Sequence, residues 1–250
     1  MAGIDLQVYG FVMTELIQAE SSSVPVRTSI YEMLRDEIVS GRLGPHARLK
    51  VSEIAGRYAT SASPVREALQ QLRGEGFVVL EPNKGARVRP IDENFVSNMT
   101  EIQAMIESLL TRWYVNIASD DDLVALEAKQ SEIEALNFRD MAAHSQLDFE
   151  FHELVYGRHY NVDAIELWRK HREVIRALGK RFPRSIARQR AVILEHRQLI
   201  EFVRSQDSNK AAEVAALHVE GAGRHIIEQM SAARPRAIGV HSAQTPMNKG

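Results

Sequence analysis

Four side chains in the C-terminal half of the chain could together bind a transition metal. Asp148 and His152, in the segment LDFEFHELV, are four residues apart and so share one face of a predicted helix. His196, in EHRQLIEFV, and His218, in ALHVEGAGRH, lie on two further predicted helices. One carboxylate and three imidazoles are a donor set that suits Zn²⁺ or Ni²⁺. Spacing alone does not show that three helices converge, so ordinary core or surface positions stay open as the alternative.

A second stretch, SASPVREAL at residues 61–69, could bind nucleic acid. A helix tolerates proline in its first turn, and a serine just before it can cap free amides, so SASP predicts a helix start. Arg66 then projects from the first turns, which is the half of a recognition helix that meets base edges. An ordinary capped helix with a solvated arginine explains these nine residues equally well, and the neighbouring elements have to decide.

The elements around Arg66 favour the DNA-binding interpretation. An apolar period of four predicts a helix from Thr28 to Gly41, and a short helix follows around Ile54–Tyr58. The helix that starts at SASP ends at Gly74, after which FVVLEPNKGARVRP alternates and predicts two short strands. Helix, helix, turn, helix and hairpin are the order of a winged helix-turn-helix, whose second motif helix lies in the major groove.

The charge of the chain is unevenly distributed. Residues 25–90 hold eleven Lys and Arg against seven Asp and Glu, although the whole chain has a formal net charge of −2. A basic first part is expected to face a polyanion. We expect Arg66 to read bases with support from two serines, Ser61 and Ser63. Phosphate contacts are expected from six basic side chains: Arg27, Arg48, Lys50, Lys84, Arg87 and Arg89.

The remainder of the chain has a helical pattern with little glycine or proline. Mixed apolar stripes predict helices near 95–117, 120–136, 139–159, 162–181, 185–206 and 208–232. Such stripes need partners, so an antiparallel bundle is the expected packing. The predicted fold is therefore mainly α, with a winged helix-turn-helix over 25–90 and a helical domain over 95–232. Residues 1–24 and 233–250 are expected to be tails.

Composition excludes several classes of protein. The 250 residues are 44 % apolar and 26 % charged, which is typical of a globular protein. The absence of cysteine excludes disulfides, cysteine-based zinc fingers and thiol nucleophiles. No apolar run reaches the roughly 18 residues of a membrane span, and the N-terminus lacks the plan of a signal peptide. We therefore expect a cytoplasmic protein without a membrane partner.

Residues 28–90 resemble the DNA-binding domain of GntR-type transcriptional regulators, through SASPVREALQQLRGEGFV and the wing sequence PNKGARV. The helical remainder is similar to the FCD-type effector domain of the FadR-like branch. The resemblance implies a ligand-responsive repressor that binds a palindromic operator in double-stranded DNA as a homodimer. It also implies that Asp148, His152, His196 and His218 hold a divalent metal, at which a small carboxylate effector binds.

Three departures from the family pattern affect the expected binding sites. Ala62 and Ser52 stand where relatives commonly carry arginine, which leaves Arg66 as the main residue for guanine recognition. Gln103 stands where relatives often have an arginine that binds a carboxylate ligand. We expect Gln103 to line the effector site, with three arginines that could replace the missing charge: Arg112, Arg172 and Arg176. A solvated helix face is the alternative for each of these three.

Two rival functions fit part of the pattern. A metal-dependent enzyme would use the same four residues to activate water. No general base is placed by a motif, however, and the DNA-binding domain would then have no role, so we expect no enzymatic activity. In the second rival a purely structural metal clamps three helices in a DNA-binding regulator without a small ligand.

Overall fold

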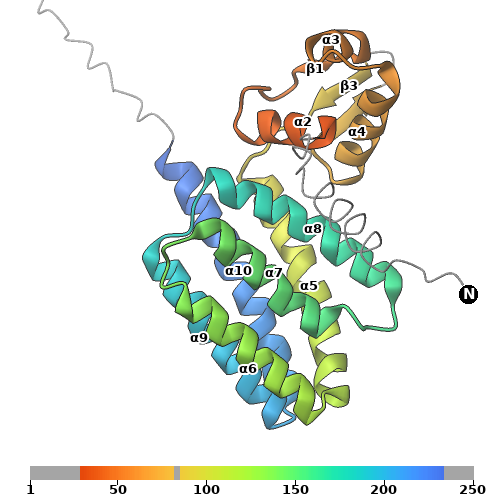
Figure 1. The fold of residues 1–250 in the computed structure, drawn as a ribbon. Helices are drawn as coiled ribbons and strands as arrows, with labels where there is room; N and C mark the ends of the chain where they lie inside the picture. The colour runs from red at the N-terminus through yellow and green to blue at the C-terminus, as the bar shows by residue number, and fades with distance from the viewer. Residues whose placement is uncertain (1–28, 82–84, 234–250) are drawn as a thin grey trace, which may run out of the picture.

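A computed structural model describes residues 29–81 and 85–233. Figure 1 shows a small N-terminal domain beside one end of a bundle of long helices. The described residues form nine helices and one three-stranded sheet. The prediction of a mainly α fold, with a winged helix-turn-helix followed by a helical domain, is confirmed. The predicted tails lie outside the described residues, apart from residue 233.

The N-terminal domain has the predicted elements in the predicted order, with one additional strand. Its helices are α2 (Ile30–Val39), α3 (Val51–Arg57) and α4 (Ala62–Gly74), and its strands are β1 (Arg48–Leu49), β2 (Val78–Glu81) and β3 (Gly85–Val88). Strand β1 was not predicted, because two residues are too few to show alternation. It pairs antiparallel with β3, which lies between β1 and β2. The sheet therefore ties the wing hairpin to the segment that leads into α3.

The C-terminal domain consists of the six predicted helices. They are α5 (Glu93–Ile117), α6 (Asp120–Ala135), α7 (Met141–Tyr156), α8 (Val162–Arg181), α9 (Ile186–Arg204) and α10 (Ser208–Ala232). Side chains of Ser119, Asp140 and Asn161 accept hydrogen bonds from the first backbone amides of α6, α7 and α8. In the parts of the chain that are described, no helix is long and apolar enough to cross a membrane.

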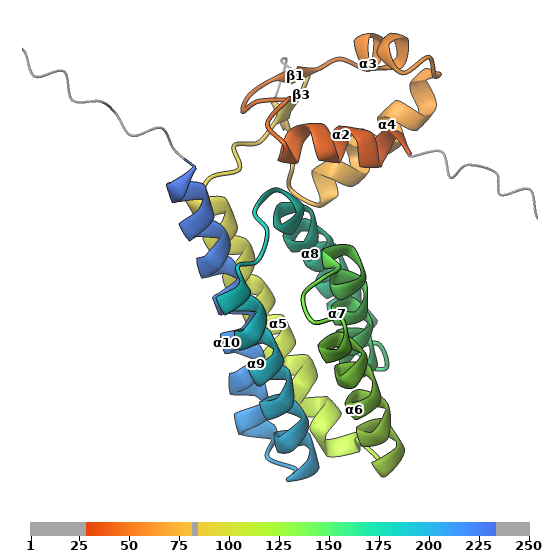
Figure 2. The ribbon, with the colours of Figure 1, turned by 60° about the vertical axis from the view of Figure 1, so that its left-hand side comes forward.

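Helices α5 and α10 run side by side along the bundle (Figures 1 and 2). Gly223 permits the close approach, because a Cβ atom at this position would meet Thr100 of α5, with its Cγ2 atom only 2.7 Å away. The two helices thus form a close pair, and α7, α8 and α9 pack against it.

Two apolar cores stabilise the chain. One lies wholly within the bundle and includes Phe151, Trp168 and Leu199. The other crosses the domain boundary, since Leu34 and Ile38 of α2 belong to the same cluster of buried side chains as Val174 and Leu178 of α8. Burial of apolar side chains is the main favourable term in such packing. The N-terminal domain is therefore seated on α8 through an apolar contact.

Candidate functional site

The four predicted metal ligands come together inside the bundle. Asp148 and His152 project from α7, His196 from α9 and His218 from α10. All four are at most 4 % exposed, and one potential ligand atom from each lies within 4.8 Å of the others. The centroids of the three imidazole rings are 5.0–5.1 Å apart. The described residues thus contain a buried Asp/His₃ group that could hold a metal ion.

Hydrogen bonds orient two of the histidine rings. Gln130 of α6 lies with its Oε1 atom 2.9 Å from Nδ1 of His196, and its own amide nitrogen donates to Glu134. Glu195 places Oε2 2.8 Å from Nδ1 of His218. With the proton on Nδ1, each ring has an unprotonated Nε2 for another partner. Metal-binding histidines in proteins are typically held by such outer hydrogen bonds.

Three ring nitrogen atoms of the group have no hydrogen-bond partner in the described structure. Both ring nitrogens of His152 and Nε2 of His196 are buried without a hydrogen-bond partner. Burial first, and nearby positive groups second, hold the pKa of His152 and of His196 well below the usual value, so both rings are neutral at pH 7. An unpaired buried polar group costs about 1–3 kcal/mol. A cation that accepts these lone pairs would remove that cost.

Asp148 is ionised in spite of its burial. Burial alone raises the pKa of a carboxyl group, but the guanidinium groups of Arg184 and Arg172 hold the pKa of Asp148 well below its usual range. Arg172 forms a close ion pair with Asp148, and Nη2 of Arg184 lies 3.3 Å from Oδ2 of the same carboxylate. The donor set therefore includes one carboxylate and the two neutral imidazoles of His152 and His196, which is the protonation state that Zn²⁺ and similar ions require of their ligands.

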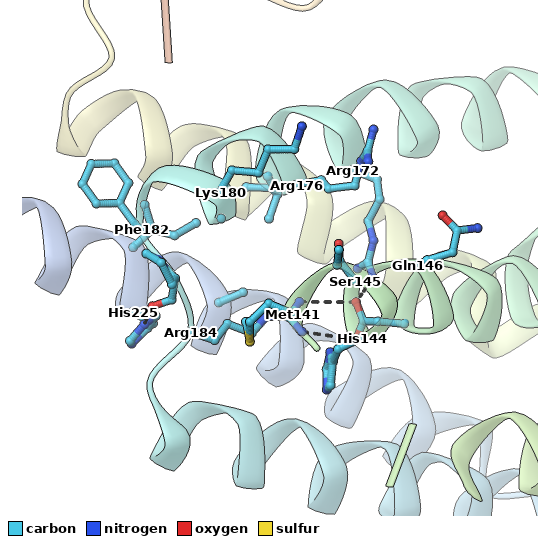
Figure 3. A pocket seen from close by; sticks show the side chains of 17 residues that line it. Met141, His144, Ser145, Gln146, Arg172, Arg176, Lys180, Phe182, Arg184 and His225 are labelled. Carbon is cyan, nitrogen blue, oxygen red and sulfur yellow. Dashed lines mark hydrogen bonds and ion pairs between the residues drawn. The ribbon is translucent and has the colours of Figure 1, made fainter. Parts of the chain in front are cut away.

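A cavity of about 390 Å³ adjoins the Asp/His₃ group. It lies between α7, α8, α10 and the turn after α8, and Asp148 forms part of its wall. Figure 3 shows Arg172 and Arg184 entering this region from different segments, with Arg176 and Lys180 further along α8. Its volume is within the range of about 300–1,000 Å³ that is common for small-molecule sites. The wall carries four cationic side chains and one carboxylate.

In the N-terminal domain, the start of α4 is open to solvent. Arg66 is exposed, and among the described residues its guanidinium group has no ion-pair or hydrogen-bond partner. Ser61, and not the serine just before the proline, is the residue that precedes the helix, and its side chain makes no capping hydrogen bond. The expectation of a serine cap is therefore wrong, and the Ser61 hydroxyl group is available to another partner. Ser63 donates to Glu67 within the helix.

The predicted phosphate-binding residues differ in their exposure and in whether they already have a partner within the protein. Arg48 is exposed in β1, and Lys50 is exposed but forms an ion pair with Glu53. Arg87 donates to the backbone oxygen of His46 and so is tied within its own domain. Arg89 follows β3 and lies over the ring of Phe95 in α5, which places it at the domain junction instead of on the wing. Two further predicted residues, Arg27 and Lys84, lie outside the described residues.

Comparison with known proteins identifies the family of each domain. Residues 26–88 match "Bacterial regulatory proteins, gntR family", and residues 98–221 match the "FCD domain". The chain belongs to the GntR family. The Galactonate operon transcriptional repressor of Escherichia coli (strain K12) is 24 % identical over 216 residues, 78 % of this chain and 94 % of that protein. The HTH-type transcriptional repressor GlaR of the same strain is 27 % identical over 210 residues, 76 % of this chain and 90 % of GlaR.

The fold of this GntR-family protein is also found in solved structures. E. coli McbR/YncC superimposes with a TM-score of 0.60 at 16 % identity, covering 80 % of this chain and 96 % of McbR/YncC. The members of the family named above regulate transcription, which confirms the prediction of a DNA-binding transcriptional regulator and not an enzyme.

Of the four residues expected to bind the effector in this GntR-family chain, two line the cavity. Arg172 does so beside Asp148, and Arg176 does so nearby. Gln103 is 2 % exposed, donates to Glu107 inside the bundle and is not one of the residues that line the cavity. Arg112 is exposed in a groove between α5 and α10 on another face. Arg112 therefore lies on a solvated helix face, which was the alternative interpretation for this residue.

Sequence reasoning missed Arg184, Gln130 and Glu195. Arg184 lies in the turn after α8, where no helical period marks a face. Gln130 and Glu195 lie 66 and 23 residues from the histidines that they contact. No local spacing could have assigned them, although the dense charge of KRFPRS at 180–185 shows that the turn carries cations.

Proposed function

We propose that this GntR-family regulator is a repressor that binds a palindromic operator as a homodimer and responds to a small carboxylate held at a divalent metal in the FCD domain. Asp148, His152, His196 and His218 would hold the metal, which is Zn²⁺ or Ni²⁺. When bound, the metal offers a Lewis-acidic position to a carboxylate oxygen. A repressor of transcription acts on chromosomal DNA, so we place the protein in the cytoplasm.

The observation that carries the proposal is the charge balance around Asp148. This buried carboxylate already has two arginine partners, Arg172 and Arg184. A divalent cation at the same carboxylate would leave four positive charges against one negative charge in a largely buried space. Uncompensated buried charge is costly, so the loaded site requires an anion. A carboxylate that reaches the metal and both guanidinium groups supplies it, and the adjoining cavity gives it room.

Arg172 and Arg184 thus supply, at the cavity wall, the positive charge that Gln103 lacks. Gln103 is bonded to Glu107 and carries no charge. A guanidinium group can bind a carboxylate through two parallel hydrogen bonds, which favours planar anions over neutral ligands. A relative with 24 % identity is named as the repressor of a galactonate operon. Sugar acids are therefore a sensible first group of carboxylates to test.

The open start of α4 supports the DNA-binding half of the proposal. Arg66 is exposed and unpaired in the described structure, so it can form a bidentate contact with guanine without losing an existing partner. A dimer presents two such helices to successive major grooves. On α5, Ile102, Met105 and Leu109 are 38–61 % exposed and repeat at helical spacing, which is the pattern of a helix that has a partner chain.

The first experiment measures metal content and DNA binding on the same preparation of the full chain. Elemental analysis by mass spectrometry gives the metal per chain. Duplexes selected from a random pool supply an operator, and its Kd is followed by fluorescence anisotropy while sugar acids and small dicarboxylates are added. We expect one metal per chain and an effector-induced change in operator Kd of about 5- to 150-fold.

The variant His196→Ala should lose both the metal and the response to the carboxylate. His171→Ala is the matched control, because His171 is a partly buried histidine outside the Asp/His₃ group. A wild type that contains metal and binds DNA, but whose operator Kd no carboxylate changes, would favour a purely structural metal. A metal-free wild type that still responds to a carboxylate would refute the metal centre.

A further inference from the structure

An ion-pair network crosses the boundary between the two domains. Glu173 of α8 accepts from two arginines through the same oxygen, Oε2. Nη2 of Arg176, also on α8, lies 2.6 Å from it, and Nη1 of Arg35 on α2 lies 3.4 Å from it. Arg35 is only 4 % exposed. A buried arginine needs acceptors, so Arg35 depends on its partners across the boundary.

The network continues from Arg35 to the end of the recognition helix. Nη1 of Arg35 donates to the hydroxyl group of Tyr31 over 3.3 Å. Burial, followed by the contact with Glu75, raises the pKa of Tyr31 to about 12, so the hydroxyl group keeps its proton. It donates to the carboxylate of Glu75 at 2.8 Å. Glu75 is the C-cap residue of α4 and is 7 % exposed.

The other end of the network reaches the cavity. Arg176 lines the cavity and is at the same time the nearest partner of Glu173. Arg172, the residue before Glu173, binds Asp148 of the Asp/His₃ group. Figure 3 shows Arg172 and Arg176 on the same stretch of α8 beside the cavity. Adjacent positions on α8 therefore serve the candidate site on one side and the DNA-binding domain on the other.

Apolar packing supports the polar network. Leu34 and Ile38 of α2 share a buried cluster with Val174, Ala177 and Leu178 of α8. Packed interiors transmit small displacements because they have few voids. A displacement of α8 that follows a change of partner at Arg172 or Arg176 is therefore passed to α2 directly.

We propose that α8 transmits effector occupancy to the recognition helix through the series Arg176, Glu173, Arg35, Tyr31 and Glu75. This inference rests on the proposed function, since it assigns the route by which that site regulates DNA binding. An anion in the cavity competes with Glu173 for Arg176, and a metal competes with Arg172 for Asp148. Either change alters how Glu173 holds Arg35, and the altered Tyr31–Glu75 contact changes the position of α4.

The first test needs no ligand. Amide hydrogen exchange is measured on the full-length wild type, Arg176→Gln, Glu173→Gln and the double variant. We expect each single variant to change the exchange rates in α2 and at the end of α4. The change in exchange rate in the double variant should differ from the product of the two single changes by about 2-fold or more, which is the lower end of coupling within one network. Glu166→Gln is the control, because Glu166 is an exposed acid on α8 outside the network.

The second test uses Zn²⁺ alone as the probe. One equivalent, compared with excess chelator, should change exchange in α2 and at the end of α4 in the wild type and in Glu166→Gln, but not in Glu173→Gln. A Glu173→Gln protein that responds as the wild type does would overturn the route, as would independent effects in the first test. A wild type that binds no Zn²⁺ would count against the proposed metal centre, and the first test then decides the route by itself.

Discussion

Loading the Asp/His₃ group with Zn²⁺ is expected to raise the thermal midpoint of the full chain by about 5–11 °C. A ligand that binds only the folded state at 100 times its Kd stabilises that state by about 2.7 kcal/mol. One kcal/mol shifts the midpoint of a protein of about 150–250 residues by about 2–4 °C. Zn²⁺ is expected to bind because, without it, three buried nitrogen atoms of His152 and His196 have no hydrogen-bond partner.

The assay is differential scanning fluorimetry at fixed Zn²⁺ and protein concentration, after removal of metal with a chelator. His196→Ala should lose at least most of the shift, since the remaining set has only three donors. His171→Ala keeps all four donors and should keep the shift. Equal shifts in the wild type and in His196→Ala would refute the reasoning, because Zn²⁺ would then be bound elsewhere on the chain.

Three further changes test other parts of the structure. Arg66→Ala should weaken binding to the selected operator by about 5- to 150-fold and relax the base preference of the protein. Fluorescence anisotropy with operator and scrambled duplexes measures both effects. An unchanged operator affinity would show that Arg66 does not recognise bases. Gln130→Leu removes the hydrogen-bond acceptor at Nδ1 of His196 and should weaken Zn²⁺ binding by about 10- to 100-fold. Competition with a chelating dye measures the Zn²⁺ Kd. An unaltered Kd would contradict a role of Gln130 in orienting His196. Gly223→Ala, whose Cβ meets Thr100, should lower the unfolding free energy in urea by about 1–3 kcal/mol. Gly179→Ala is the control, because its Cβ meets nothing within 4 Å, and it should keep the unfolding free energy or raise it by up to about 1 kcal/mol. Equal effects of the two substitutions would contradict a tight contact between α5 and α10 at Gly223.

The helices could be predicted because their signals are local. Apolar residues that recur every three to four positions mark the buried face, and capping residues mark the first turn. The helix expected over 139–159 runs from Met141 to Tyr156, since Asp140 caps its start and Gly157 follows its end. Strand β1 could not be predicted, because its two residues form a strand only through their pairing with β3.

The candidate site was partly open to sequence reasoning. Asp148 and His152 are one helical turn apart, so their common face follows from geometry alone. That His196 and His218 join them depends on tertiary packing, and the resemblance to FadR-like regulators supplied that information. Arg184 had neither kind of signal, because it lies in a turn and its contact with Asp148 spans 36 residues.

The segment HREVIR at 171–176 shows why charge in a sequence is easily misjudged. Its alternating signs are typical of a solvated helix face, which was the alternative for Arg172 and Arg176. Successive residues on an α-helix point about 100° apart, so neighbours contact different parts of the protein. Arg172 binds the carboxylate of the candidate metal centre, and Glu173 binds the buried Arg35 of the DNA-binding domain. Because both contacts depend on the position of one helix, we expect a movement of α8 that alters one of them to alter the other as well.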